Sequence, residues 1–185
     1  MRPIRRPADV VRMGGAPVVA DASVLIHLSR IGRFELLRQL YETIVIPKGV
    51  YTEVVEVGWS LPGSVETERG IKEGWIKVMS VRDRLAVREL TVRHGLHTAN
   101  AEVVQLAGEL GAVEVLADDA KVRLLVERRG LKVRGCMGLL IEAAKRGFLS
   151  VSEARRAINE LVEKGYRVSR EVLRMAHELL SRLER

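Results

Sequence analysis

The chain has little cysteine, few aromatic residues and no long apolar run, and each shortage excludes a class of protein. Its 185 residues include one cysteine, Cys136, so neither an internal disulfide nor a thiolate metal cluster can form. Aromatic residues make up 4% of the chain, which argues against a broad platform for stacked bases. No apolar stretch is long enough to cross a membrane, and the N-terminus lacks the apolar core of a signal peptide. These shortages predict a cytoplasmic protein, in which Cys136 is a small buried residue near a helix start.

The chain is rich in apolar residues and carries a net positive charge. Hydrophobic residues make up 47% of it, which supports one domain with a sizeable core. Lysine and arginine number 31 against 24 acidic residues, so the net charge is +7. Such an excess favours phosphate-rich partners, bound through contacts to the nucleic-acid backbone. The four histidines show no metal-ligand spacing, so we expect them to be structural or exposed.

Short apolar runs alternate with helical patterns along most of the chain. Strands are expected at about 17–20, 43–47, 75–79, 113–117 and 131–134. Helices are expected at about 22–29, 32–41, 48–57, 64–73, 82–94, 99–110, 119–129 and 137–146. This alternation predicts a three-layer α/β/α sandwich with a central parallel sheet of about five strands. Right-handed crossovers place the carboxyl ends of all strands at one edge, where open α/β sheets bind ligands.

Three regions of different character divide the chain. Residues 1–16 combine arginines with prolines and glycines, which predicts a flexible basic arm. Residues 17–149 hold the alternating strands and helices. Residues 150–185 form a helical pair whose second helix has apolar residues at helical spacing. This pair is expected to pack on the domain or to form a dimer interface.

Five carboxylates are expected near the carboxyl edge of the sheet. Asp21 ends the first strand, and Asp118 with Asp119 ends the fourth. Glu53 and Glu102 lie on helices whose starts face the same edge. Converging like charges repel unless a cation neutralises them, and hard oxygen ligands suit Mg²⁺ or Mn²⁺. A basic surface could then hold a phosphate backbone while the acidic pit holds the metal, as metal-assisted phosphodiester hydrolysis requires.

Each of these carboxylates also has a structural alternative. Asp21 and Asp118 stand where an aspartate caps the helix that follows. Asp119 and Glu102 lie in the first turns of helices, where the helix dipole favours negative charge. Glu53 fits a solvated helix face equally well. The residues alone therefore leave both interpretations open.

Three segments together resemble the motifs of one family, the PIN domains, a metal-dependent ribonuclease fold. VVADASVLIHLSRIG, from Val18, places Asp-x-Ser-x-Leu-Ile after an apolar strand. IVIPKGVYTEV, from Ile44, carries Glu53 in the acidic place of the second motif. VEVLADDAKVRLLVERRGLKVRGCMGLL, from Val113, resembles a branch common in archaea that has paired aspartates and a glycine-flanked helix start. The resemblance covers about residues 17–149.

The resemblance implies endoribonuclease chemistry, in which one or two Mg²⁺ or Mn²⁺ ions activate a water for in-line attack on RNA. It assigns catalysis to Asp21, Glu53 and Asp118. The implied metal ligands are Asp21, Glu53, Glu102, Asp118 and Asp119. Many similar proteins are toxins held by a small antitoxin, and many form homodimers, so both partners are expectations here.

The resemblance also implies supporting residues. Ser23 would hydrogen-bond and orient an acidic neighbour. The usual third carboxylate falls on Asn100, whose carbonyl oxygen can bind a cation without supplying a charge, while Glu102 follows two residues later. Lys121 and Arg123 stand near the expected mouth, where they would touch phosphates or form a solvated helix face.

Three other functions are alternatives to the nuclease. A haloacid-dehalogenase-like phosphatase needs Asp-x-Asp at the first strand end, where this chain has Ser23 in the second place. A dinucleotide-binding fold needs Gly-x-Gly-x-x-Gly, and DASVLI contains no glycine. A catalytically weakened PIN-like module that binds RNA or protein remains the main alternative, and Asn100 is the residue that favours it.

Overall fold

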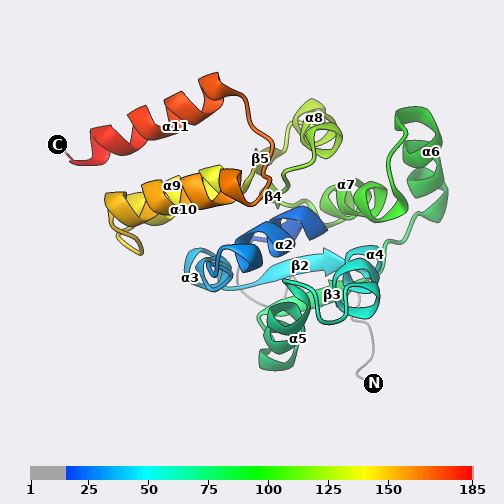
Figure 1. Cartoon of the computed structure of the whole chain (residues 1–185). Helices are drawn as coiled ribbons and strands as arrows, with labels where there is room; N and C mark the ends of the chain where they lie inside the picture. The colour runs from blue at the N-terminus through cyan, green and yellow to red at the C-terminus, as the bar shows by residue number, and fades with distance from the viewer. Residues whose placement is uncertain (1–15, 185) are drawn as a thin grey trace.

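The computed structural model describes residues 16–184 of the chain. Five parallel strands form one sheet in the order β3-β2-β1-β4-β5 (Figure 1). The strands are β1 (Val18–Ala20), β2 (Ile44–Pro47), β3 (Ile76–Met79), β4 (Glu114–Leu116) and β5 (Lys132–Arg134). The predicted α/β sandwich with its five-stranded parallel sheet is therefore confirmed. The basic arm predicted at 1–16 lies almost wholly outside the described residues.

Helices connect the strands and cover the sheet. They are α2 (Ala22–Arg30), α3 (Leu36–Leu40), α4 (Lys48–Tyr51), α5 (Ser64–Glu73), α6 (Arg84–His94), α7 (Thr98–Leu110), α8 (Ala120–Arg128), α9 (Cys136–Lys145), α10 (Val151–Glu163) and α11 (Arg170–Ser181). A π-helix, η1 (Thr52–Val57), continues α4, and a 3₁₀ turn, η2 (Arg182–Glu184), follows α11. Helices α9, α10 and α11 lie side by side at one end of the molecule, and α6 packs on α7 at the other (Figure 1).

Two helices differ from the sequence prediction. The helix expected at 32–41 begins only at Leu36, because Gly32 adopts a left-handed conformation that ends the preceding segment in a turn. The single helix expected at 48–57 is divided between α4 and the π-helical η1. A π-helix has more residues per turn than an α-helix, so the faces of residues 52–57 do not follow the 3.6-residue period.

The middle of the sheet forms the core. Strands β1 and β4 pair in register from Val18–Glu114 to Ala20–Leu116, and all three residues of each strand are buried. Near-continuous apolar runs of this kind suit a parallel sheet covered on both faces. The backbone N–H of Asp21 donates to the carbonyl of Leu116 at 2.9 Å. The first residues after β1 and β4 are therefore neighbours in space.

The C-terminal helices pack on α9. Ser150 and Glu153 form a capping box that starts α10, whose Ile158 and Leu161 are buried. Helix α11 buries Ala176 but leaves an apolar stripe partly exposed, namely Val172, Met175 and Leu179. Within residues 16–184, no helix has both the length and the apolar character needed to cross a membrane.

Candidate functional site

Asp21 places a buried carboxylate directly after β1. Its Oδ1 accepts hydrogen bonds from the Ser23 hydroxyl at 2.7 Å and from the Val24 backbone N–H at 3.0 Å. Its Oδ2 is buried and has no partner among the described residues. Burial raises the pKa of Asp21 to about 7, although the bonds from Ser23 and Val24 oppose the rise. The ionised carboxylate thus has one oxygen for which a cation would be a suitable partner.

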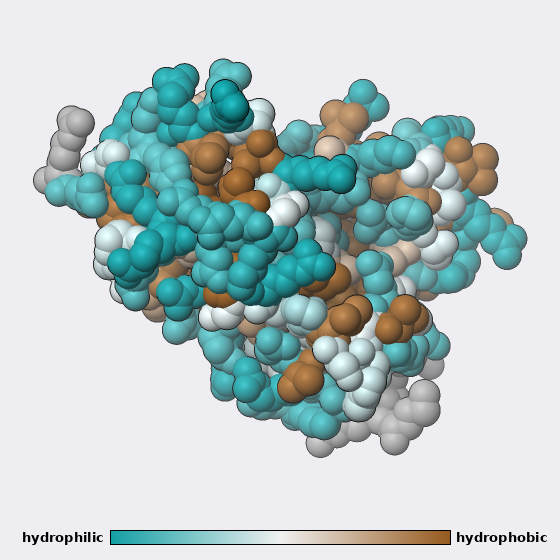
Figure 2. Space-filling model, viewed as in Figure 1, coloured by the Kyte–Doolittle hydropathy of each residue, from teal (hydrophilic) through white to brown (hydrophobic). Residues whose placement is uncertain are grey.

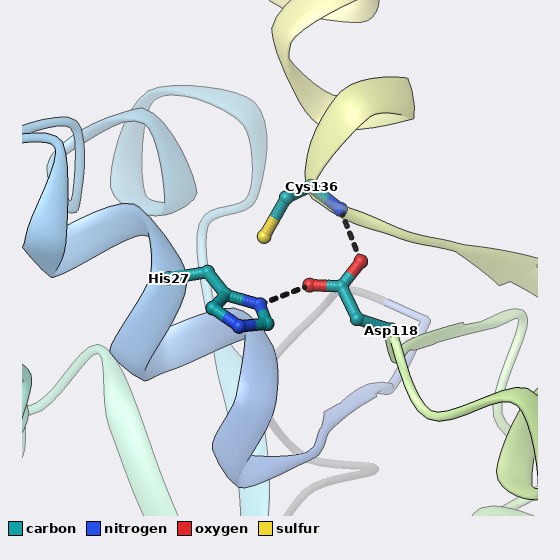
Figure 3. A group of neighbouring side chains, drawn as sticks. All are labelled: His27, Asp118 and Cys136. Atoms are coloured by element: carbon teal, nitrogen blue, oxygen red, sulfur yellow. Dashed lines mark hydrogen bonds and ion pairs between the residues drawn. The ribbon is translucent and has the colours of Figure 1, made fainter. Parts of the chain in front are cut away.

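Asp118 is less buried than Asp21, with 5% of its side chain exposed, and both of its carboxylate oxygens have hydrogen-bond partners (Figure 3). Its Oδ1 accepts from the Cys136 backbone N–H and from the Tyr166 hydroxyl, both at 2.8 Å. Its Oδ2 lies 2.9 Å from His27 Nδ1. Burial favours the neutral acid, but the hydrogen bonds from His27, Cys136 and Tyr166 prevail and lower the pKa of Asp118. Asp118 therefore joins α2, the start of α9 and the segment after α10.

His27, Asp118 and Cys136 bring three potential ligand atoms within 4.8 Å of one another (Figure 3). A metal at this place would need a thiolate and a free carboxylate oxygen. Burial, reinforced by the charge of Asp118, instead raises the pKa of the Cys136 thiol well above its usual value. His27 already occupies Asp118 Oδ2. Hydrogen bonds account for this cluster, and Cys136 is buried at a helix start, as expected.

Asp119 follows Asp118 in sequence but has a different environment. Its Oδ1 caps α8 by accepting from the backbone N–H groups of Lys121 and Val122, each at 2.9 Å. Its side chain is partly exposed, and no described residue bonds its second oxygen. The charges of Asp118 and Asp119 both contribute to the raised pKa of Asp21, so both lie near that carboxylate. Asp21 and Asp119 are thus neighbouring aspartates that each keep one oxygen without a partner among residues 16–184.

Glu53 and Glu102 lie along an open groove of about 860 Å³ between α4, η1 and α7. Glu102 is buried, with Oε2 accepting from the Gly49 backbone N–H at 2.7 Å and Oε1 paired with Arg84. Glu53 is exposed on η1, and Asn100 lines the same groove. The structure therefore places the predicted carboxylates in two sets. Asp21, Asp118 and Asp119 follow the strands, whereas Glu53 and Glu102 line the groove.

The two basic residues expected to touch phosphates make contacts within the protein. Lys121 Nζ donates to the carbonyl of Gly95 at 3.0 Å, which ties α8 to the end of α6. Arg123 donates through a guanidinium nitrogen to the carbonyl of Ala117 at 3.1 Å, which ties α8 to the end of β4. Their role with phosphates stays a prediction. The Ser23 hydroxyl donates to Asp21 and accepts from the backbone N–H of Asp118, and its role in orienting a metal ligand stays a prediction as well.

Sequence reasoning missed four residues of these networks: His27, Tyr166, Arg84 and Gly49. His27 lies four residues after Ser23, so both are on one face of α2. That four-residue spacing could have indicated that His27 faces the same carboxylates as Ser23. Tyr166 and Arg84 reach their carboxylates from 48 and 18 residues away, and no local pattern encodes such contacts.

The parallel sheet with carboxylates at the ends of β1 and β4 defines an α/β protein of the open-sheet class, in which ligands generally bind at the carboxyl edge of the sheet. The chain belongs to the PIN-domain family, because a family model described as a PIN domain matches residues 17–182. This match continues beyond residue 149 through α10 and α11. PIN domains are generally nucleases and typically use divalent metal ions.

Among solved structures, the chain is similar to PAE2754 from Pyrobaculum aerophilum. The TM-score is 0.52 at 18% sequence identity, over 70% of this chain and 96% of that one. At this identity the likeness supports the fold alone. A comparison with curated proteins finds no match.

Replacing Gly49 by Ala is expected to disturb Glu102. A Cβ at this position would lie 2.8 Å from Glu102 Oε2 and 3.0 Å from the Cα of Ala99. We expect Gly49→Ala to lower the free energy of unfolding by about 1–3 kcal/mol, as overpacking does. Gly108→Ala is the matched control, because this helical glycine has open space around it and alanine should stabilise the helix by up to about 1 kcal/mol. Urea unfolding of both variants measures the difference, and equal stabilities would contradict the packing argument.

Proposed function

We propose that this protein is a metal-dependent endoribonuclease that hydrolyses RNA phosphodiester bonds at the carboxyl edge of its sheet. The observation that carries the proposal is the buried Asp21 carboxylate, whose Oδ2 has no partner among the described residues. A buried ionised group without a partner is costly, and a divalent cation would remove that cost. Family membership agrees with this chemistry, because PIN domains generally are nucleases.

The carboxylates differ in how well they suit Mg²⁺ or Mn²⁺. Asp21 and Asp119 each keep one oxygen without a described partner, and such hard oxygen donors suit these ions. Asp118 bonds three donors, and Glu102 has a partner on each oxygen. We therefore assign the metal to Asp21 and Asp119, while Asp118 acts as a positioning residue. Glu102 can join them only if Arg84 gives up its ion pair.

The remaining groups of the site have separate tasks in this proposal. A divalent ion held by Asp21 and Asp119 would supply positive charge and a water of lowered pKa. Glu53, exposed in the groove, can accept a hydrogen bond from an attacking water. Lys48 and His97 line the same groove, where positive or hydrogen-bonding groups can hold phosphate oxygens. Ser23 fixes the orientation of Asp21 through its 2.7 Å hydrogen bond.

Cleavage of a mixed-sequence single-stranded RNA tests the proposal. We expect fragments with Mn²⁺ or Mg²⁺ and none with EDTA, because Asp21 and Asp119 need the ion to act. Asp21→Asn protein from the same purification shows whether a contaminant cuts the RNA. Folded wild-type protein that leaves the RNA intact with either ion would contradict the proposal.

Two observations favour a second candidate, a PIN-like module that binds RNA or protein without cutting. Asn100 lacks the charge of the usual carboxylate, and Arg84 already neutralises Glu102. RNA binding that persists in EDTA, with no cleavage in either metal, would support this candidate. An Asn100→Asp variant that gains cleavage would then identify the missing charge. The antitoxin and the homodimer stay predictions, for which the exposed apolar stripe of α11 offers a surface.

A further inference from the structure

An exposed tryptophan stands close to the groove. The chain has two tryptophans, Trp75 with 7% of its surface exposed and Trp59 with 70%. Large aromatic side chains normally bury most of their area, because removing their surface from water stabilises the fold. Trp59 gains little of that stabilisation in this structure. We therefore expect a binding partner to cover the Trp59 side chain.

The backbone holds Trp59 outward in a tight turn. The Leu61 N–H donates to the Gly58 carbonyl at 2.8 Å, which closes a four-residue turn with Trp59 as its second residue. Ser60, the third, has φ of 68°, the left-handed value that a type II turn requires there. Gly58 has no room for a side chain, since a Cβ would lie 2.5 Å from the Val54 carbonyl oxygen. A positive φ at a non-glycine residue is uncommon and costs free energy. The surrounding structure must therefore hold the turn in this conformation.

The turn lies at the rim of the groove that contains Glu53. Val57, two residues before Trp59, lines the groove and is itself 77% exposed. Leu61, in the same turn, and Val65, in the first turn of α5, are also exposed apolar side chains, at 62% and 66%. Figure 2 shows brown and pale atoms gathered over the area where Figure 1 places α4 and α5. An apolar rim thus adjoins a groove whose lining includes Lys48 and His97, beside the Arg84–Glu102 ion pair and the exposed Glu53.

We propose that Trp59 stacks on an unpaired nucleobase of single-stranded RNA whose backbone follows the groove. This inference rests on the proposed function, because it names how that substrate would be held. Lys48, which is not paired with Glu102 as Arg84 is, suits a phosphate, and a flat aromatic face at the rim suits a base attached to the same backbone. Paired bases in a duplex keep their faces covered, so the contact selects single strands. One aromatic contact also fits a chain with too few aromatic residues for a broad platform.

Fluorescence titration in EDTA tests the stacking without any turnover. A single-stranded mixed-sequence oligoribonucleotide should quench the emission of Trp59, whereas the buried Trp75 should change little. Trp59→Phe should remove the quenching but keep most of the affinity, because a smaller aromatic face remains. Trp59→Ala and Trp59→Leu should each weaken binding about tenfold, as loss of one stacked base predicts. Both substitutions are at an exposed position, so the fold should be unaffected.

The leucine variant distinguishes RNA from a protein partner. Leucine keeps apolar bulk but has no aromatic face, so a surface that only binds protein would leave RNA affinity unchanged in Trp59→Leu. That result, or equal quenching by duplex RNA, would overturn the proposal. Leu61→Ala is the matched control, since it trims the same apolar rim without touching the ring and should leave RNA affinity within about twofold.

Failure of this inference can be told apart from failure of the nuclease proposal. Metal-dependent cleavage with no quenching and an unchanged KM in Trp59→Ala would overturn the stacking alone. Quenching with a tenfold weaker Trp59→Ala and no cleavage in Mn²⁺ or Mg²⁺ would support the stacking and overturn the nuclease.

Discussion

Asp21→Asn is expected to abolish metal-dependent RNA cleavage and, at the same time, to stabilise the metal-free protein at neutral pH. Asparagine keeps the volume of the side chain and an oxygen for the bonds from Ser23 and Val24. It removes the charge that would hold the cation, so we expect cleavage to fall by at least about a thousandfold, in line with losses at essential catalytic groups. It also removes a buried charge that has an oxygen without a partner.

The stability effect has a definite dependence on pH. The pKa of Asp21 is about 7 in the folded protein, against 3.8 for the ordinary group. The folded state therefore binds this proton more tightly, and the contribution of Asp21 to stability falls as pH rises from about 4 to about 7. The full shift corresponds to about 4 kcal/mol as an upper limit. The Asp21→Asn protein does not lose this stability as the pH rises. Its free energy of unfolding should therefore exceed that of the wild type at pH 8 but not at pH 4.

Urea unfolding in EDTA at several pH values measures the effect. Mg²⁺ or Mn²⁺ at pH 8 should stabilise the wild type and leave Asp21→Asn unchanged, because a ligand stabilises only the state that binds it. Asp83→Asn is the matched control, since this exposed aspartate caps α6 and asparagine caps equally well. If Asp21→Asn cleaved RNA normally, or gained no stability at pH 8, the assignment of Asp21 would be wrong.

The strand ends were predictable because they depend on local pattern and topology. Short apolar runs located all five strands, and the crossover rule placed Asp21 and Asp118 at the same edge. Adjacent parallel pairing of β1 and β4 then brought these residues together. Composition and periodicity describe short stretches of sequence, and crossover handedness holds for the whole sheet. None of them requires knowledge of individual side-chain contacts, so they were enough to predict the strand ends.

The environments of individual carboxylates were not predictable. Asp118 and Asp119 are neighbours in sequence, yet one points into a buried cluster and the other caps α8. The difference depends on Tyr166, which lies 48 residues away. Glu53 lies on a π-helix, so the α-helical period could not give its face. Glu102 and Asn100 both line the groove, although a two-residue step turns an ideal α-helix by about 200°.

Asp118→Asn should cost more stability than Asp119→Asn, whereas Asp119→Asn should cost more cleavage, although the two residues are adjacent. Asp118 accepts from His27, Cys136 and Tyr166, and an amide would turn its own N–H groups toward some of these donors. We expect Asp118→Asn to lower the free energy of unfolding by about 3 kcal/mol, as breaking a buried charged network does. Asp119→Asn keeps a good N-cap and should change stability by less than about 0.5 kcal/mol.

For cleavage, Asp119→Asn should be the more impaired of the two variants. Asp119→Asn removes a charge from the proposed metal site, so we expect metal-dependent cleavage to fall at least about a hundredfold. Folded Asp118→Asn should lose less, because in this assignment Asp118 acts through its neighbours. Tyr166→Phe is the matched control for the cluster, since it removes one donor and should cost about 1 kcal/mol. If Asp118→Asn were as stable as the wild type but inactive, while Asp119→Asn cleaved normally, Asp118 would be the metal ligand. Its three hydrogen bonds would then have to rearrange when the ion binds.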